Sequence, residues 1–180
     1  MPKRLLLLFP LLSLLASCED ATTDLFPALA PVHLPAETQV GANTLGGLVN
    51  GQLWEASNSP TLDGRVLTPT ARYAHGELQL EAFRRLQVEG PVANLRLVAA
   101  RVTGPGVYLL AAPAAETGRT ATLGGIGQPP TPATGTLTIT RLDTTGLHPM
   151  VAGRFELKAA PAAGEVLRMS EGRFDVQLSQ

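Results

Sequence analysis

The sequence predicts an all-β domain, folded as an antiparallel β-sandwich or flattened barrel of about 8–10 strands with little or no helix. Three observations lead to this prediction. Apolar and polar residues alternate with a period of two through most of the chain after residue 34, which is typical of half-buried strands. Clusters of Gly and Pro separate the alternating segments. One alternating phrase occurs twice near the C-terminal end, which favours a hairpin.

The repeated phrase predicts a long antiparallel hairpin. Residues 150–159 contain Gly-Arg-Phe-Glu-Leu, residues 170–178 contain Gly-Arg-Phe-Asp-Val, and the connection at 160–164 is rich in Ala, Pro and Gly. The alternation directs one set of side chains to the core and the charged set to the opposite, solvated face, where cross-strand ion pairs are expected. The expected core set is Phe155, Leu157, Phe174, Val176 and Leu178, and the expected solvated set is Arg154, Glu156, Arg173 and Asp175.

A second hairpin is expected near the start of the domain. Asn50-Gly51 stands between Leu48-Val49 and Leu53-Trp54, and Asn-Gly is favoured in type I′ turns because both central residues need positive φ. Trp54, the only tryptophan of the chain, is expected to be half buried beside this turn. A core or rim position is the commoner one for such a residue, and stacking on a ligand is the alternative.

Further strands are predicted between the two hairpins. Residues 77–83 alternate as a strand, although a helix over 77–87 is an alternative because Leu78, Ala82 and Leu86 lie four residues apart. The remaining strand-like segments are 94–102, 107–110, 119–123 and 135–143, separated by connections at 58–70, 104–106, 111–116 and 124–130. Tyr108 lies in one of these strands and is, with Trp54, a candidate for contact with a ligand or partner.

The first residues have the order of a secretory signal. Lys3 and Arg4 precede an apolar run from Leu5 to Leu15, which is shorter than the roughly 20 residues that a membrane-spanning helix needs. Leu-Ala-Ser-Cys at 15–18 resembles the bacterial lipobox, in which the cysteine receives a diacylglyceryl group, and Cys18 is the only cysteine. We therefore expect residues 1–17 to be a lipoprotein signal peptide, 18–33 a flexible acidic and Pro-rich tether, and 34–180 a single β domain.

Lipidation of Cys18 would hold the chain at a membrane, and the net charge of the chain bears on which other partners it can bind. Each buried methylene of an acyl chain contributes about 0.8 kcal/mol, so several chains hold a protein firmly. The sequence has a formal net charge of −1, which argues against nucleic acid as a partner because binding to phosphates needs a basic face. With its one cysteine committed to the anchor, the domain is expected to fold without a disulfide.

A catalytic or metal-binding pattern is not recognisable in the sequence. The three histidines, His33, His75 and His148, stand alone beside turn residues and lack metal-ligand spacing. The chain has no Gly-x-Ser-x-Gly segment, and its Gly-Gly-Ile-Gly at 124–127 lacks the Lys-Ser/Thr of a phosphate-binding loop. Glu156 and Asp175 are explained more simply by ion pairs to neighbouring arginines than by paired-carboxylate catalysis. No catalytic residue, cofactor or metal is therefore assigned.

Several segments in order resemble a family of uncharacterised Bacteroidota lipoproteins. Thr-Gln-Val-Gly-Ala-Asn-Thr at 38–44 runs into Val-Asn-Gly-Gln-Leu-Trp at 49–54, and Glu-Gly-Arg-Phe-Asp-Val follows at 171–176. Acidic Glu19 and Asp20 after the cysteine resemble a surface-export signal of such lipoproteins, with a simple soluble linker as the alternative. The resemblance implies an outer-membrane lipoprotein, with a slight preference for the cell surface over the periplasm, and it implies no activity.

The expected function follows from these observations. A lipid-anchored envelope protein with an all-β domain and no catalytic pattern is expected to be a non-catalytic binding or structural module, whose envelope or extracellular partner the sequence does not name. A carrier with an internal cavity for an apolar or glycan ligand is the alternative. A hydrolase whose site forms only in the folded chain ranks last.

Overall fold

The computed structural model describes residues 31–57, 68–85, 87–111 and 117–179. The predicted signal peptide, Cys18, most of the predicted tether and most of the predicted 58–70 connection lie outside the described residues. By its contacts the chain divides into residues 1–31 and 32–180, and the fold described below belongs to the second unit. The regular elements of the described residues are all strands, joined by turns and loops. Among these residues there is no helix long and apolar enough to cross a membrane.

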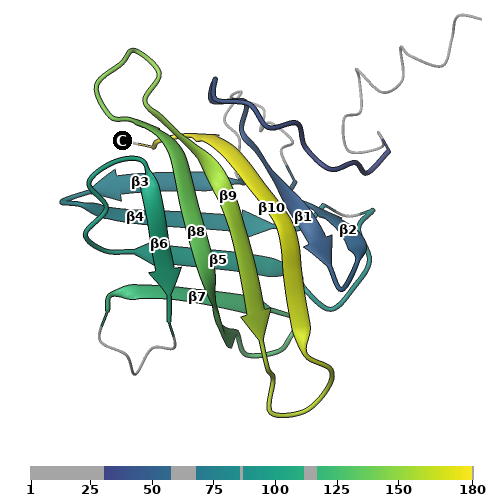
Figure 1. Ribbon diagram of the computed structural model, residues 1–180. Helices are drawn as coiled ribbons and strands as arrows, with labels where there is room; N and C mark the ends of the chain where they lie inside the picture. Colours follow the sequence, from purple (N-terminus) through teal and green to yellow (C-terminus); the bar gives the residue numbers. More distant parts are fainter. Residues whose placement is uncertain (1–30, 58–67, 86, 112–116, 180) are drawn as a thin grey trace, which may run out of the picture. The chain divides into compact units, whose positions relative to one another are not determined.

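The prediction of an all-β antiparallel fold is confirmed. Ten strands form one antiparallel sheet, which curls over on itself. Figure 1 shows the strands in order: β1 Thr44–Val49, β2 Gln52–Glu55, β3 Thr70–Ala74, β4 Glu77–Phe83, β5 Asn94–Ala99, β6 Gly106–Leu110, β7 Arg119–Gly124, β8 Thr131–Asp143, β9 Met150–Ala159 and β10 Leu167–Gln177.

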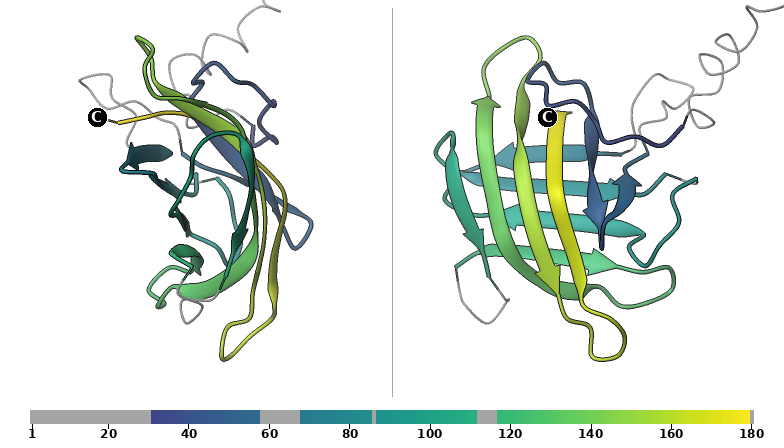
Figure 2. Two further views of the ribbon diagram at one scale, coloured as in Figure 1. Left: turned by 60° about the vertical axis from the view of Figure 1, so that its left-hand side comes forward. Right: turned by 45° about the vertical axis from the view of Figure 1, so that its right-hand side comes forward.

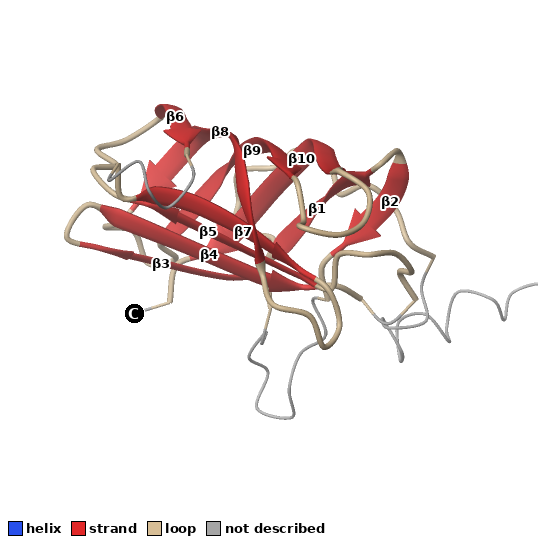
Figure 3. Ribbon diagram, turned by 90° about the horizontal axis from the view of Figure 1, so that it is seen from below, coloured by secondary structure: helices blue, strands red, loops and turns tan. Residues whose placement is uncertain are grey.

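The curled sheet has two facing layers. Its strand order is β2-β1-β10-β9-β8-β7-β5-β4-β3, with β6 paired to β8 beside this path. Strands β3, β4, β5 and β7 form one layer, and β6, β8, β9, β10, β1 and β2 form the other, as the views in Figures 2 and 3 show. Isolated bridges between Ala56 and Arg84 and between Ala71 and Leu178 join the layers at the opposite side of the fold.

Strand β8 carries the sheet from one layer to the other. Its first residues pair with β7, from Leu123–Thr131 to Ala121–Ala133, and its middle residues pair instead with β6, from Leu110–Gly135 to Gly106–Ile139. The opposite edge of β8 stays paired with β9 from Ala133 to Asp143. A 13-residue strand can therefore leave one layer and continue in the other without losing its partner.

The repeated Gly-Arg-Phe phrase forms the predicted hairpin of β9 and β10. The register places Phe155 opposite Gly172 and Phe174 opposite Gly153, so each phenylalanine covers the glycine of the other strand. A Cβ atom at Gly172 would lie 2.6 Å from the Phe155 ring, and one at Gly153 would lie 2.8 Å from the Phe174 ring. Phe155 and Phe174 are buried, and a glycine under an aromatic ring lets the backbone and ring approach closely.

The core between the layers is filled by large apolar side chains. The inward positions of every long strand contribute, and the largest fully buried side chains are Trp54, Phe155, Leu45, Leu78, Leu80, Leu95, Leu97, Leu123, Leu137, Ile139, Met169 and Val92. The inward positions predicted for Phe155, Leu157, Phe174 and Val176 are confirmed, and Leu178 is partly buried against the same core. Burial of each such side chain contributes about 1.5–3 kcal/mol.

Other turns and strands predicted from the sequence are also present in the structure. Asn50 and Gly51 have φ of 49° and 83° in the tight turn between β1 and β2, which pair from Val49–Gln52 to Gly46–Glu55. Residues 77–83 form β4, so the helix over 77–87 is wrong. The structure adds β3, which the sequence analysis missed, joined to β4 by a turn with positive φ at His75 and Gly76.

The prediction that Asp175 lies on a solvated face is wrong. Asp175 is 1% exposed, because residues 35–43, here called the strap, cross the outer face of β10 at this point. Its carboxylate accepts hydrogen bonds from the Thr38 hydroxyl (2.6 Å) and from the backbone N–H groups of Val40 (3.0 Å) and Gly41 (2.8 Å). A buried carboxylate with three donors is well satisfied and holds the strap in place.

The ion pairs of the hairpin also differ from the expectation. Arg154 and Arg173 lie directly opposite each other in the β9–β10 register, while Asp175 lies opposite Ala152. Both guanidinium groups pair with Glu37 of the strap, through Arg154 Nε at 3.1 Å and Arg173 Nη1 at 3.9 Å. Like charges opposite each other destabilise a sheet, and the strap carboxylate between them offsets that repulsion.

The strap continues into β1 with further bonds to β10. Gln177 donates its backbone N–H to Asn43 Oδ1 at 3.0 Å and its side-chain amide to the Gly41 carbonyl at 3.0 Å. Gly41 and Asn43 have φ of 75° and 55°, values that Gly and Asn adopt most readily. The segments at 38–44 and 171–176 that carry the family resemblance therefore meet in the fold.

We predict that Asp175→Asn lowers the free energy of unfolding by about 1–3 kcal/mol, because an amide cannot accept all three hydrogen bonds and leaves a buried N–H unpaired. Urea denaturation followed by the fluorescence of Trp54 measures this. Asp143→Asn is the matched control, since that carboxylate accepts bonds from Thr145 and Gly146 in an exposed turn where water replaces them. Equal midpoints for both variants and wild type would show that Asp175 does not hold the strap.

Candidate functional site

Among the hollows of the described surface, two stand out, each on the outer face of one layer. The first, of about 480 Å³, lies over β4, β5 and β7, and the second, of about 490 Å³, lies over β8, β9 and β10. Most residues that line the first hollow are outward positions, which alternate along their strands with the buried Leu80, Leu97 and Leu123. The buried Ala82 and Leu95 also belong to its lining, so the hollow lies on the outer face of the layer. Neither hollow is a cavity between the layers.

Phe83, at the end of β4, is the most conspicuous side chain of the first hollow. Trp54, Tyr108, Phe155 and Phe174 are buried and Tyr73 is half buried, which leaves Phe83, at 56%, as the exposed aromatic residue of the described chain. Its backbone is held on both sides, because its N–H donates to Thr68 Oγ1 and its carbonyl accepts from the Ser57 N–H, both at 2.8 Å. Single exposed apolar side chains are common, and Phe83 differs from the others in being aromatic and in lying in a hollow beside polar groups.

A cross-strand ion pair forms the centre of this hollow. Arg96 Nε lies 3.1 Å from Glu81 Oε1, and both side chains are about half exposed. Glu81, Arg96 and Thr122 are neighbours across β4, β5 and β7 in the sheet register. Such an exposed pair adds only about 0–1 kcal/mol to stability. Within the described chain it leaves the terminal guanidinium nitrogens of Arg96 free to bind a ligand.

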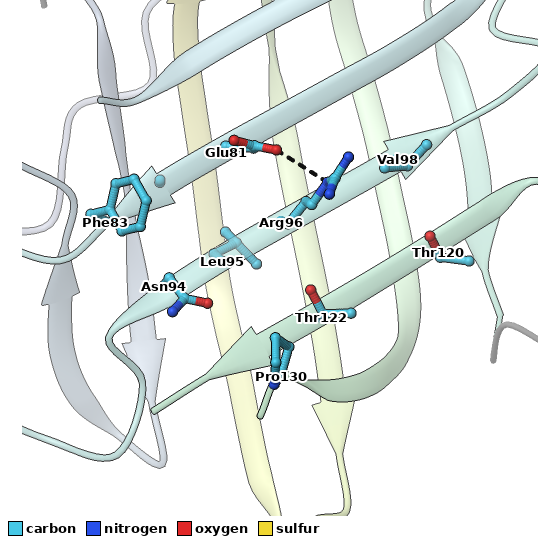
Figure 4. A pocket seen from close by; sticks show the side chains of 10 residues that line it. Glu81, Phe83, Asn94, Leu95, Arg96, Val98, Thr120, Thr122 and Pro130 are labelled. Carbon is cyan, nitrogen blue, oxygen red and sulfur yellow. Dashed lines mark ion pairs between the residues drawn. The ribbon is translucent and has the colours of Figure 1, made fainter. Parts of the chain in front are cut away.

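Polar and apolar groups complete the rim. Asn94 lies opposite Gly124 in the register, and its amide occupies the space that a side chain at that glycine would fill. Thr120 and Thr122 add hydroxyl groups from β7, and Val98 and Pro130 add apolar surface. Figure 4 shows Phe83 at one end of the hollow, Val98 and Thr120 at the other, and Asn94 between Phe83 and Pro130. Donors, acceptors and a flat ring therefore face the same space.

The second hollow is built from groups that already serve the strap. Its lining includes Glu37, Arg154, Arg173, Thr136 and Thr138. Both arginines pair with Glu37, and Arg173 also donates to the Pro35 carbonyl at 3.3 Å and pairs with Glu171 at 3.4 Å. These contacts use Glu37 and both arginines to fasten the strap, which gives most of this surface a structural explanation. Glu156 also lines the hollow, but it is exposed and forms no ion pair among the described residues, so its predicted pairing with an arginine is wrong.

Trp54, a sequence-predicted contact residue, lies in the core. It is 1% exposed, and its indole N–H donates to the Val92 carbonyl at 2.8 Å. The bond joins β2 to the segment between β4 and β5, so the residue fastens one layer to the other. The structure thus gives Trp54 the core position that was the commoner of the two expectations.

Tyr108, the other predicted contact residue, is buried as well. It is 7% exposed, and its hydroxyl donates to the Gly104 carbonyl at 2.6 Å and accepts from the Thr103 N–H at 3.4 Å. The Arg119 guanidinium lies 5.1 Å from the ring centroid, within cation–π range. The hydroxyl contacts close the turn before β6. Tyr108 and Trp54 line neither hollow.

The buried ion pair of Glu55 and Arg85 is a structural element. The two side chains are 7% and 5% exposed, and Arg85 Nη1 lies 2.9 Å from Glu55 Oε2. The backbone N–H of Arg85 also donates to the Glu55 carbonyl at 2.9 Å, and the backbone N–H of the exposed His33 donates to Glu55 Oε2 at 3.4 Å. The pair therefore joins the end of β2 to the end of β4, beside the bridge between the layers, and losing one partner of a buried pair costs about 3–5 kcal/mol.

Over 31–57, 68–85, 87–111 and 117–179 no group of three or more His, Cys, Asp or Glu side chains is arranged to hold a metal ion. His75 and His148 are exposed turn residues. The Asp143 pKa is lowered by hydrogen bonds from the backbone N–H groups of Thr145 and Gly146, with a smaller contribution from Arg141, and this is a turn contact away from both hollows.

No family model, curated protein or solved structure matches this chain. The site is therefore interpreted from its own residues. The sequence analysis missed Phe83, although the alternation of 77–83 contained the relevant signal. Leu78, Leu80 and Ala82 point inward, so Phe83 belongs to the outward set with Gln79 and Glu81. An aromatic side chain among these polar ones is the signal that could have drawn attention to it.

We predict that Trp54→Phe lowers the free energy of unfolding by about 1–3 kcal/mol, because the Val92 carbonyl loses its donor while most of the ring volume is kept. Urea denaturation followed by circular dichroism measures this, since the fluorescent residue is removed. Leu53→Ala, at the exposed neighbouring position of β2, is the control and should have a smaller effect. Wild-type stability of Trp54→Phe would contradict the core position.

Proposed function

We propose that this protein is a lipid-anchored lipoprotein of the bacterial outer membrane that acts as a non-catalytic binding module. Its β domain receives a partner on the outer face of β4, β5 and β7, hereafter the Phe83 face, defined by Phe83, Glu81, Asn94, Arg96 and Thr122. The observation that carries the proposal is the 56% exposure of Phe83 in a hollow whose polar groups have little structural duty.

The anchor half of the proposal rests on the sequence. A short positive start, an apolar run and a lipobox-like Leu-Ala-Ser-Cys precede an acidic, Pro-rich stretch. Acyl chains on Cys18 would hold the domain at the membrane while the tether lets it reach a partner. The acidic residues after Cys18 favour display on the cell surface over the periplasm. The resemblance to Bacteroidota lipoproteins supports the same address, and the segments that carry it are those that interlock at Asp175.

The binding half rests on the distribution of polar groups. The buried charges, Glu55, Arg85 and Asp175, are satisfied by protein partners and fasten the fold. In the first hollow the charges are Glu81 and Arg96, which pair with each other and hold no buried segment in place. A nucleophile next to a base, which a hydrolase would use, does not occur among the residues lining the first hollow. A carrier with an internal cavity is disfavoured because the large core side chains fill the space between the layers.

We predict that Cys18→Ala abolishes incorporation of radiolabelled fatty acid and moves the protein from the membrane fraction to the soluble fraction. Ser17→Ala is the matched control, because it keeps a small residue before the cysteine and should leave both properties unchanged. Protease treatment of intact cells then reports the side of the membrane: digestion of the wild-type domain supports surface display, and protection places it in the periplasm. Normal fractionation and labelling of Cys18→Ala would overturn the anchor.

A further inference from the structure

We infer that the ligand of the Phe83 face is an uncharged glycan chain, bound by stacking on Phe83 and by hydrogen bonds to Asn94, Arg96, Glu81 and Thr122. This inference rests on the proposed function and names the class of ligand for the same surface. It is drawn from the kinds of side chain that meet in the hollow and from their charge.

The position of the hollow excludes one common mode of protein recognition. The hollow lies on the face of three paired strands, β4, β5 and β7, and its floor is made of side chains. An extended peptide that adds to a sheet needs a free strand edge with unpaired N–H and C=O groups. Since β5 is paired on both sides, the ligand must be recognised through side chains alone.

The side chains present suit a ligand with an apolar face and many hydroxyl groups. Phe83 offers a flat ring whose negative face attracts the polarised C–H groups of a sugar ring. The amide of Asn94 and the Thr122 hydroxyl each donate and accept, Arg96 donates and Glu81 accepts. Neighbouring hydroxyl groups of a sugar act both as donors and as acceptors, so this set can satisfy them without leaving a polar group unpaired.

Charge indicates an uncharged glycan. Glu81 and Arg96 form a 1:1 ion pair at 3.1 Å in the centre of the hollow. An anionic chain would meet the Glu81 carboxylate and compete with it for Arg96, and a cationic one would compete for Glu81. A neutral chain can bond to both groups without separating them, which avoids the cost of an unpaired charge.

Size and openness agree with an oligosaccharide segment. A hollow of about 480 Å³ falls in the range of about 300–1,000 Å³ typical of small-molecule sites. Phe83 lies at one end of it, and Val98 and Thr120 lie at the other (Figure 4). Because it lies open on a sheet face, a long chain can pass across it with a few sugar rings in contact.

Affinity electrophoresis of the full-length, detergent-solubilised protein tests the inference. Native gels would contain soluble neutral polysaccharides, namely glucans, mannans, xylans and galactans of defined linkage, or the anionic alginate and polygalacturonate. We expect retardation by at least one neutral polysaccharide. Phe83→Ala should weaken it by about tenfold or more, as for an aromatic hot spot, and Asn94→Ala should weaken it too. Val107→Ala, a similarly exposed apolar site on β6, should bind as wild type.

The outcomes separate failure of the ligand class from failure of the proposed function. Wild-type retardation of Phe83→Ala, or retardation by the anionic polysaccharides alone, overturns the inference. If no glycan binds, a photo-crosslinking phenylalanine analogue at position 83 is tested in cells. Capture of a protein there overturns the glycan while the binding module stands, and no capture overturns both. Release of reducing ends from a bound polysaccharide would contradict a non-catalytic module while supporting the glycan.

Discussion

The buried carboxylate of Asp175 is the constraint on which the arrangement of this domain depends. It stands near the end of the last strand and binds the backbone of Val40 and Gly41, which precede the first strand. A carboxylate without partners at 1% exposure would be costly, so strap and hairpin must form together. The same contact covers the outer face of β9 and β10, where two opposed arginines need the Glu37 carboxylate. The segment before β1 and the last strand of the domain are thereby held to each other.

That constraint also explains which face of the sheet is left for function. One layer has its outer face crossed by the strap, and its arginines are used to hold Glu37. The other layer, reached through the long strand β8, has no covering segment over Phe83, Asn94 and Arg96 in the described chain. The large core residues fill the space between the layers. The outside of β4, β5 and β7 therefore offers polar groups and an exposed ring, and this is where the proposed partner would bind.

Alternation in the sequence predicted the fold well and the site poorly, for one physical reason. A period of two reports which face of a strand a residue belongs to, and this was enough for β4, the Asn50-Gly51 turn and the β9–β10 hairpin. It does not report what lies over the outer face. Asp175 was assigned to solvent because nothing in its own strand reveals the strap, and Phe83 was overlooked because outward positions were taken as solvated. Trp54 and Tyr108 drew attention as aromatic residues, yet their polar atoms are satisfied by nearby carbonyl groups in the fold.

The central claim is that the outer face of β4, β5 and β7, rather than the interior, is the binding surface of a tethered module. Amide chemical-shift mapping by NMR tests this most directly, with the full-length protein in detergent micelles titrated with an oligosaccharide of the neutral polysaccharide that retards it. The account predicts that shifts concentrate at Phe83, Arg96 and Thr122, while the Trp54 indole signal and the strap stay unchanged. Shifts centred on Trp54 and Val92, or on residues 35–43, would contradict it and place the ligand in the core or under the strap.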